Sequence, residues 1–279
     1  MQNMKGRVAV ITGAGSGIGR GLAIACGAEE MHLVLADIQA DALADVVDEL
    51  RTAGCDVGGM VTDVADRAQV DALAKFAFDR HGTVHLLCNN AGVIDDNLPS
   101  WACPPADWQW VLGVNLMGVV HGIEAFVPRM IERGEPGHIV NTASIGGLVT
   151  TTANTPYTVS KHAVIALSEC LYKELEARQA SIGVSALCPG WVATGIADAD
   201  RNRPAARDLG AAEQGRRERL RAAIGEGMDP LAVGRLVIEA VQEGRFYIKT
   251  HPHWDHTIEE RFAAILDGRR PATTRLPRE

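Results

Sequence analysis

The sequence has few features of a nucleic-acid-binding, secreted or membrane protein. Over 279 residues the formal net charge is −8, and no lysine and arginine block stands out before the final residues, which argues against nucleic acid or a membrane as a partner. No pair of the six cysteines forms C-x-x-C, so we expect buried free thiols and a reducing, cytoplasmic setting. We expect no cleavable leader and no apolar run that approaches the length of a membrane span.

The sequence does contain a regular alternation of short apolar runs and longer helical patterns. The runs are continuously apolar rather than alternating, which is typical of a parallel sheet covered by helices on both faces. This order predicts right-handed βαβ units in a doubly wound, Rossmann-like α/β sheet, with 1–279 forming a single domain. Strands are predicted at 7–12, 32–37, 57–63, 85–90, 137–144, 182–189 and 245–249, and helices at 17–29, 41–53, 67–81, 107–133, 156–178 and 230–243.

Two segments break this alternation. Residues 193–229 are polar with weak helical periodicity, and we expect a long loop there that serves as an active-site lid. The basic stretch GRRERLRAA within it is best interpreted as a solvated helix face. The tail, about 251–279, contains the amphipathic piece TIEERFAAIL. Its histidines at 251, 253 and 256 fit no zinc pattern, so we predict packing or a partner contact and no metal site.

The stretch VITGAGSGIGRG at 10–21 places a glycine-rich loop between a predicted strand and a predicted helix. Glycines there let the backbone approach a pyrophosphate, and the helix N-terminus offers unpaired N–H groups. A flexible linker would also be rich in glycine, but the flanking strand and helix make that interpretation poor. The spacing differs from G-x-G-x-x-G. It fits T-G-x-x-x-G-x-G instead, through Thr12, Gly13, Gly17 and Gly19.

That spacing is the signature of the short-chain dehydrogenase/reductase family, which the chain resembles from about residue 6 to 250. The further motifs occur in the family's order: NNAG at 89–92, the asparagine at 115, a serine at 144 followed by Y-x-x-x-K at 157–161, and PGWVAT at 189–194. The resemblance implies an oxidoreductase with a dinucleotide cofactor. It also implies a catalytic tetrad of Asn115, Ser144, Tyr157 and Lys161.

The cofactor is predicted from the end of the second strand. Asp37 lies 18 residues past Gly19, where an acidic residue hydrogen-bonds the ribose 2′-OH of NAD and repels the 2′-phosphate of NADP. Arg20 is nearby, but we expect it to face solvent. We therefore predict NAD, with NADP less favoured. The contacts that the resemblance implies are Gly13, Ser16, Gly17, Ile18, Gly19, Asp37, Asp63, Val64, Asn90, Ala91, Gly92, Tyr157, Lys161, Pro189, Gly190, Val192 and Thr194.

The predicted chemistry depends on Tyr157 and Lys161, which lie four residues apart on one helix face. A tyrosine needs about 4 kcal/mol of phenolate stabilisation to act as a base at neutral pH, and one ammonium at roughly 4 Å supplies about that much. Tyr157 can therefore serve as general acid/base in reversible hydride transfer. The resemblance implies that Ser144 hydrogen-bonds the substrate oxygen and that Asn115 is linked to Lys161 through water.

The residues expected to face the substrate are mostly apolar, which favours a hydrophobic, aryl secondary alcohol or ketone. Residues 114–131 and 251–266 resemble a bacterial branch of the family that oxidises benzylic alcohols of lignin-type aryl compounds. Two alternatives stay open: an NAD-binding regulatory module without turnover, and a sugar, steroid or acyl substrate. The resemblance also implies a homodimer or homotetramer. The predicted substrate contacts are Ile94, Trp101, Ser144, Ile145, Gly146, Asn154 and Trp191.

Overall fold

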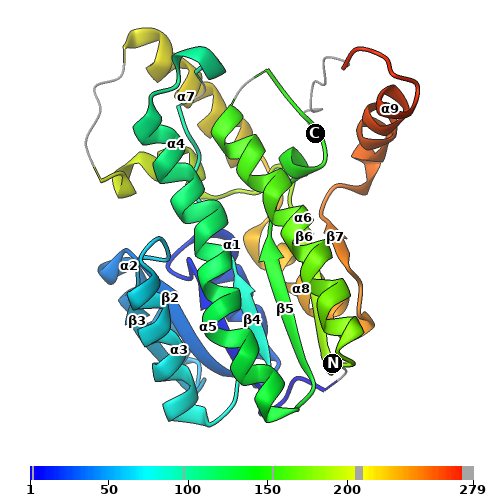
Figure 1. The fold of residues 1–279 in the computed structure, drawn as a ribbon. Coiled ribbons are helices and arrows are strands. Elements are labelled where there is room, and N and C mark those ends of the chain that lie inside the picture. The colour runs from blue at the N-terminus through cyan, green and yellow to red at the C-terminus, as the bar shows by residue number, and fades with distance from the viewer. Residues whose placement is uncertain (2, 97, 153, 205–209, 272–279) are drawn as a thin grey trace.

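A computed structural model describes residues 1, 3–96, 98–152, 154–204 and 210–271. Within these residues, seven strands form one parallel sheet in the order β3-β2-β1-β4-β5-β6-β7 (Figure 1). Strand β1 pairs with β2 on one side and β4 on the other. The chain order therefore reverses at β1, where doubly wound sheets bind ligands. The strands are β1 (Val8–Thr12), β2 (His32–Asp37), β3 (Val57–Val61), β4 (Leu86–Asn89), β5 (Gly137–Thr142), β6 (Ile182–Cys188) and β7 (Tyr247–Lys249).

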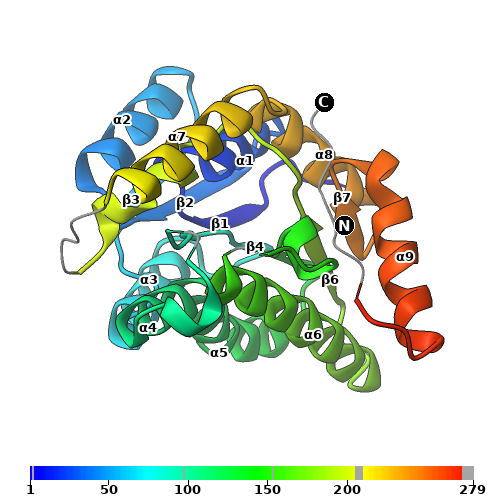
Figure 2. The same cartoon turned by 90° about the horizontal axis from the view of Figure 1, so that it is seen from above.

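Helices cover both faces of the sheet (Figure 2), which confirms the predicted fold class. On one face lie α1 (Gly17–Ala28), α2 (Ala40–Thr52) and α8 (Pro230–Glu243), and on the other lie α3 (Arg67–His81), α5 (Gly118–Arg133) and α6 (Thr155–Ala177). The β1 neighbours Ile11 and Val10 belong to two different hydrophobic cores, because their side chains point to opposite faces of the sheet. Ile11 belongs to the core that contains Leu22 and Val237, and Val10 belongs to the core that contains Leu73 and Phe126. All six cysteines are free, as expected, but only Cys26, Cys88 and Cys188 are buried, and Cys170 is exposed.

Helices α1 and α8 cross at unusually close range because two glycines meet there. A Cβ on Gly21 would lie 2.2 Å from the Pro230 carbonyl oxygen, and a Cβ on Gly234 would lie 2.3 Å from the Gly21 carbonyl oxygen. Both separations are far below van der Waals contact. The last glycine of the VITGAGSGIGRG stretch therefore serves helix packing.

The helix predicted at 107–133 is interrupted. It comprises α4 (Pro105–Leu112), a π-helical turn η2 (Gly113–Met117) and α5. The run Pro105–Arg133 is long and apolar enough to cross a membrane by length and composition, and its most apolar 18-residue window has a mean hydropathy of 1.5. This corrects our expectation that no run approaches that length. Half of its most apolar window is buried inside the protein, where the run packs against α3, α6 and β4.

The segment predicted as a long loop is more ordered than expected. It contains the 3₁₀ helix η4 (Gly195–Asn202) and the α-helix α7 (Ala211–Gly225), with 205–209 outside the described residues. A bridge between Val192 and Met228 closes its base. The basic stretch lies on the helix α7, as predicted, but it is not wholly solvated, because Arg217 pairs with Asp96 and Asp200 and its side chain is only 18% exposed. The amphipathic piece of the tail forms α9 (Asp255–Leu266), which lies above β7 at the upper right of Figure 1. Residues 272–279 lie outside the described residues.

Candidate active site

A cleft of about 810 Å³ opens at the carboxyl ends of the strands, between the sheet and the lid. Every residue predicted to contact the cofactor lines this cleft, from Gly13 in the first loop to Thr194 at the start of the lid. The cleft lies at the β1–β4 switch point, the place at which parallel sheets bind dinucleotides.

The glycine loop forms a tight turn under the N-terminus of α1. Gly13 has a φ of 65°, and a Cβ on Gly19 would lie 1.9 Å from the Gly13 carbonyl oxygen, so only glycine fits. The N-cap residue Ser16 makes no side-chain cap hydrogen bond, and the first turn of α1 holds no acidic residue. The first N–H groups of this helix can therefore receive an anion such as a pyrophosphate, and the residues present fit a dinucleotide.

The NNAG motif fixes this loop to the neighbouring strand. The Thr12 hydroxyl accepts hydrogen bonds from the N–H groups of Asn90, at 2.9 Å, and Ala91, at 3.1 Å. The Asn90 side-chain amide also donates, to the Thr12 carbonyl oxygen at 2.9 Å. These bonds tie the ends of β1 and β4 together, so the floor of the cleft is rigid.

Asp37 lines the cleft and also organises its adenosine side. One carboxylate oxygen accepts from the Gly15 N–H at 2.8 Å, and the other accepts from the Gln39 N–H at 2.9 Å. This structural role was not part of the sequence prediction, and it leaves lone pairs on both oxygens for a ligand. Arg20 does not approach Asp37. It forms a surface ion pair with Glu49 at 2.6 Å.

Tyr157 and Lys161 lie together in the cleft wall, one helical turn apart on α6. The Lys161 ammonium nitrogen is 5.6 Å from the centre of the Tyr157 ring and donates to the Thr142 carbonyl oxygen at 2.8 Å. Burial lowers the pKa of Lys161 to about 8. Burial also raises the pKa of Tyr157, while a hydrogen bond from Ser144 opposes that effect. The arrangement can hold a proton on a phenol beside a buried cation.

Asn115 lies in the π-helical turn and is fully buried behind the cleft. Its amide oxygen accepts from the Val93 N–H at 2.8 Å, and its amide nitrogen donates to the Val93 carbonyl at 2.9 Å and to the Ser160 hydroxyl at 3.0 Å. These bonds satisfy the side chain and explain why it is tolerated in an apolar helix. The water-mediated link to Lys161 stays a prediction.

The substrate side agrees only in part with the sequence expectation. Ile94, Gly146, Asn154 and Trp191 line the cleft. Ser144 does not, but its hydroxyl contacts Tyr157. Ile145 is a correction, because Ser144 caps the short helix η3 (Ile145–Gly147), and that turn packs Ile145 against Val149 and Trp254 in the core. Trp101 is a second correction, since it is 89% exposed and does not line the cleft.

The lid contributes residues that the sequence reasoning missed. Arg203 is buried, stacks 4.4 Å over the Trp110 ring and forms ion pairs with Asp96 and Asp107. Asn202, next to it, receives a hydrogen bond from Gln39 at the adenosine side. The lid therefore contacts both ends of the cleft. A polar segment with weak periodicity gives no sign of these pairings, because their partners lie about a hundred residues away in the sequence.

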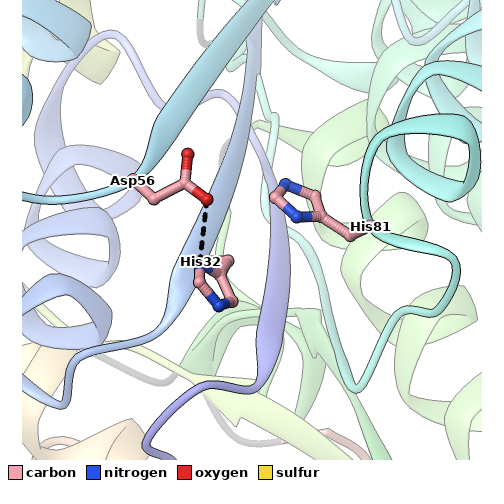
Figure 3. Close-up of side chains that lie close together, drawn as sticks. All are labelled: His32, Asp56 and His81. Carbon is pink, nitrogen blue, oxygen red and sulfur yellow. Dashed lines mark ion pairs between the residues drawn. The ribbon is translucent and has the colours of Figure 1, made fainter.

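A cluster of metal-ligating side chains lies at the amino ends of β2 and β3, away from the carboxyl ends where the cleft opens. Figure 3 shows His32, Asp56 and His81 close together there. Asp56 pairs with His32 at 2.9 Å and with Arg80 at 2.5 Å. Arg80 also donates to the His81 ring at 3.2 Å, so a guanidinium already occupies the ligand atoms and repels a cation. Arg80 is also the main reason why the pKa of Asp56 is low. We interpret the cluster as an ion-pair network.

The comparisons with known proteins agree with this geometry. The short chain dehydrogenase family model matches residues 7–205, and the chain belongs to this family of oxidoreductases, which use a nicotinamide dinucleotide. A short chain dehydrogenase/reductase from Burkholderia phymatum in complex with NAD is 44% identical, with a TM-score of 0.95 over 99% of this chain and 100% of that one. The C alpha-dehydrogenase of Sphingobium sp. strain SYK-6 is 33% identical over 97% of this chain and 89% of the relative. A CLA biosynthesis dehydrogenase/reductase of Lactiplantibacillus plantarum is 31% identical over 96% of both chains.

Proposed function

We propose that this protein is an NAD-dependent dehydrogenase that interconverts a hydrophobic, aryl secondary alcohol and its ketone. The observation that carries the proposal is the cleft wall, where Tyr157 and Lys161 stand beside apolar side chains that include Ile94, Trp110 and Trp191. Such a wall binds an aromatic group and excludes water from the reacting atoms. The similarity to the Sphingobium C alpha-dehydrogenase supports a dehydrogenase reaction.

In the proposed reaction the chain's own residues handle the proton. NAD, when bound, supplies the hydride acceptor. Tyr157, which lines the cleft, takes the proton of the substrate hydroxyl group, and the Ser144 hydroxyl hydrogen-bonds the Tyr157 phenol. The buried ammonium of Lys161 stabilises the Tyr157 phenolate that accepts this proton and becomes the neutral phenol. In ketone reduction the same tyrosine returns the proton.

Two observations favour NAD over NADP. The Asp37 carboxylate faces the cleft and would repel a 2′-phosphate, and the nearby cation of Arg20 is held by Glu49. We therefore expect catalytic efficiency with NAD to exceed that with NADP by about tenfold or more, the value of one charged contact. Asp37→Asn removes the charge but keeps an oxygen for the turn, so this ratio should fall. Asp41→Asn, an exposed change in the next helix, is the matched control. A wild-type preference for NADP would contradict the proposal.

The substrate class is tested with purified enzyme, NAD and a panel of aryl, aliphatic, sugar and steroid alcohols, followed by the absorbance of the reduced cofactor. We expect turnover to be highest with aryl secondary alcohols, and a matching panel of ketones tests the reverse direction. Faster turnover of a sugar or steroid alcohol would refute the aryl assignment. Tight NAD binding with no turnover of any alcohol or ketone would favour the regulatory module instead.

A further inference from the structure

Helix α6, which carries Tyr157 and Lys161, begins without a cap of its own. Its N-cap residue Asn154 has a left-handed φ of 53° and makes no side-chain cap hydrogen bond. Pro156 has no N–H, so Tyr157 carries a first-turn N–H for which the helix itself has no acceptor. The unsatisfied donor therefore lies on the same residue as the proposed general base.

The acceptor for this N–H comes from the segment that follows β4. Asp95 is only 4% exposed, and its Oδ1 accepts the Tyr157 N–H at 3.3 Å. Its Oδ2 is buried and makes no hydrogen bond within the part of the chain that the structure describes. Asp95 also lines a cavity of about 20 Å³ against the lid, which has room for about one water molecule. A buried carboxylate with one oxygen left without a hydrogen bond is costly, so we ask what its position contributes.

The surroundings of Asp95 make its charge dependent on pH. Burial, reinforced by Asp107 and Asp96, raises the pKa of Asp95 to about 6. The carboxylate in turn contributes to the raised pKa of Tyr157, although burial of the phenol is the larger cause and Ser144 opposes it. The other charged groups that face this region are Asp200, Arg203, Arg216 and Arg217, and Arg203 and Arg217 both pair with Asp96.

We propose that Asp95 is a positioning residue that caps helix α6 from outside the helix and so fixes both the place of Tyr157 and the readiness with which its phenolate forms. The inference rests on the proposed function, because it assumes that Tyr157 exchanges the substrate proton. It separates two effects of one side chain. The hydrogen bond holds the helix start in place, and the negative charge opposes a second negative charge on the phenol.

Two substitutions distinguish these effects. Asp95→Asn keeps an oxygen acceptor for the Tyr157 N–H and removes the charge, whereas Asp95→Ala removes both. The control is Asp66→Ala, because Asp66 caps a different helix, α3, through the Ala68 N–H at 2.9 Å and does not itself line the cleft. Phenolate formation is measured without substrate by the ultraviolet absorbance of tyrosinate during a pH titration. The chain has three tyrosines, so repeating each titration with Tyr157→Phe added isolates the signal of Tyr157.

In Asp95→Asn we expect Tyr157 to titrate at lower pH, the rising limb of alcohol oxidation to move the same way, and kcat to stay within about threefold of wild type. Asp95→Ala should show the same titration change and lose about tenfold in kcat, as a lost cap that misplaces the base would cause. Asp66→Ala should change neither. An unmoved Tyr157 titration in Asp95→Asn, or wild-type kcat in Asp95→Ala, overturns the inference. If Asp95→Ala does not fold, the titration of Asp95→Asn decides alone. Full activity of Tyr157→Phe would refute the proposed function instead.

Discussion

Replacing Lys161 by methionine removes the buried ammonium while keeping a long unbranched side chain. The ammonium lies 5.6 Å from the Tyr157 ring centre. Taken as the separation of the two charges, this distance gives an attraction of about 3 kcal/mol at an effective dielectric constant near 20. Without it, the phenolate is disfavoured by that amount. Because only the phenolate accepts the substrate proton, Lys161→Met should lower kcat for alcohol oxidation at pH 7 on the order of a hundredfold.

The same substitution should make the fold more stable at neutral pH. Burial lowers the pKa of Lys161 from 10.5 to about 8, so a buried ammonium costs about 3 kcal/mol. Losing the hydrogen bond to the Thr142 carbonyl costs the variant about 1 kcal/mol of stability. The net gain in the free energy of unfolding is therefore about 2 kcal/mol. The unfolded lysine holds its proton up to about pH 10.4, so the penalty is complete below pH 8 and fades between pH 8 and that value. The stability gain of Lys161→Met should fade over the same range.

Both effects are measurable with one pair of variants. Urea unfolding at pH 7 and pH 10 reports the free energy of unfolding, and initial rates report kcat. Lys75→Met is the control, because Lys75 is an exposed partner of Asp79 on α3 and such surface pairs contribute little. If Lys161→Met kept kcat within a few-fold of wild type at pH 7, or lost stability at that pH, the electrostatic reasoning would be wrong.

Two further predictions concern helix packing and the lid. Gly21→Ala forces a Cβ to within 2.2 Å of the Pro230 carbonyl oxygen, so we expect a loss of about 1–3 kcal/mol in urea unfolding. Gly225→Ala, where a Cβ meets nothing within 4 Å, should be neutral or slightly stabilising, and equal losses in both variants would rule out the close-contact explanation. Arg203→Met removes the lid's ion pairs with Asp96 and Asp107, so NADH should dissociate about tenfold faster in stopped-flow fluorescence. Arg221→Met, which breaks an exposed pair with Asp198 on the same lid, should leave that rate unchanged, and an unaltered rate in Arg203→Met would show that these ion pairs do not retain the cofactor.

Local patterns were sufficient to predict the sheet and most of its helices. Each predicted strand overlaps an observed one, because continuous apolar runs with turn residues between them have few alternatives in a doubly wound fold. The helix predicted at 107–133 was different. Its apolar pattern continues through Gly113–Met117 and gives no sign of the π-helical turn that forms there, within which the Asn115 amide bonds to Val93.

Contacts between distant segments were beyond the sequence reasoning. The spacing of Gly13, Gly17 and Gly19 predicts a phosphate-binding loop, but nothing local indicates that Gly21 packs against α8. Ile145 follows Ser144 and was placed in the cleft by proximity alone, whereas a short capped turn directs it into the core. The ordered structure of the lid could not be predicted from its own sequence, which is polar and only weakly periodic. The ion pairs that hold it involve residues about a hundred positions away in the sequence.

The central claim is that Tyr157 exchanges the proton of the substrate hydroxyl, and the phenol oxygen is the only atom that Tyr157→Phe removes. The direct measurement compares this variant with wild type in NADH affinity, by fluorescence titration, and in turnover of the best alcohol found. The account predicts nearly unchanged NADH binding and a loss of turnover of at least about a thousandfold. Turnover within tenfold of wild type, with NADH bound equally well, would contradict it.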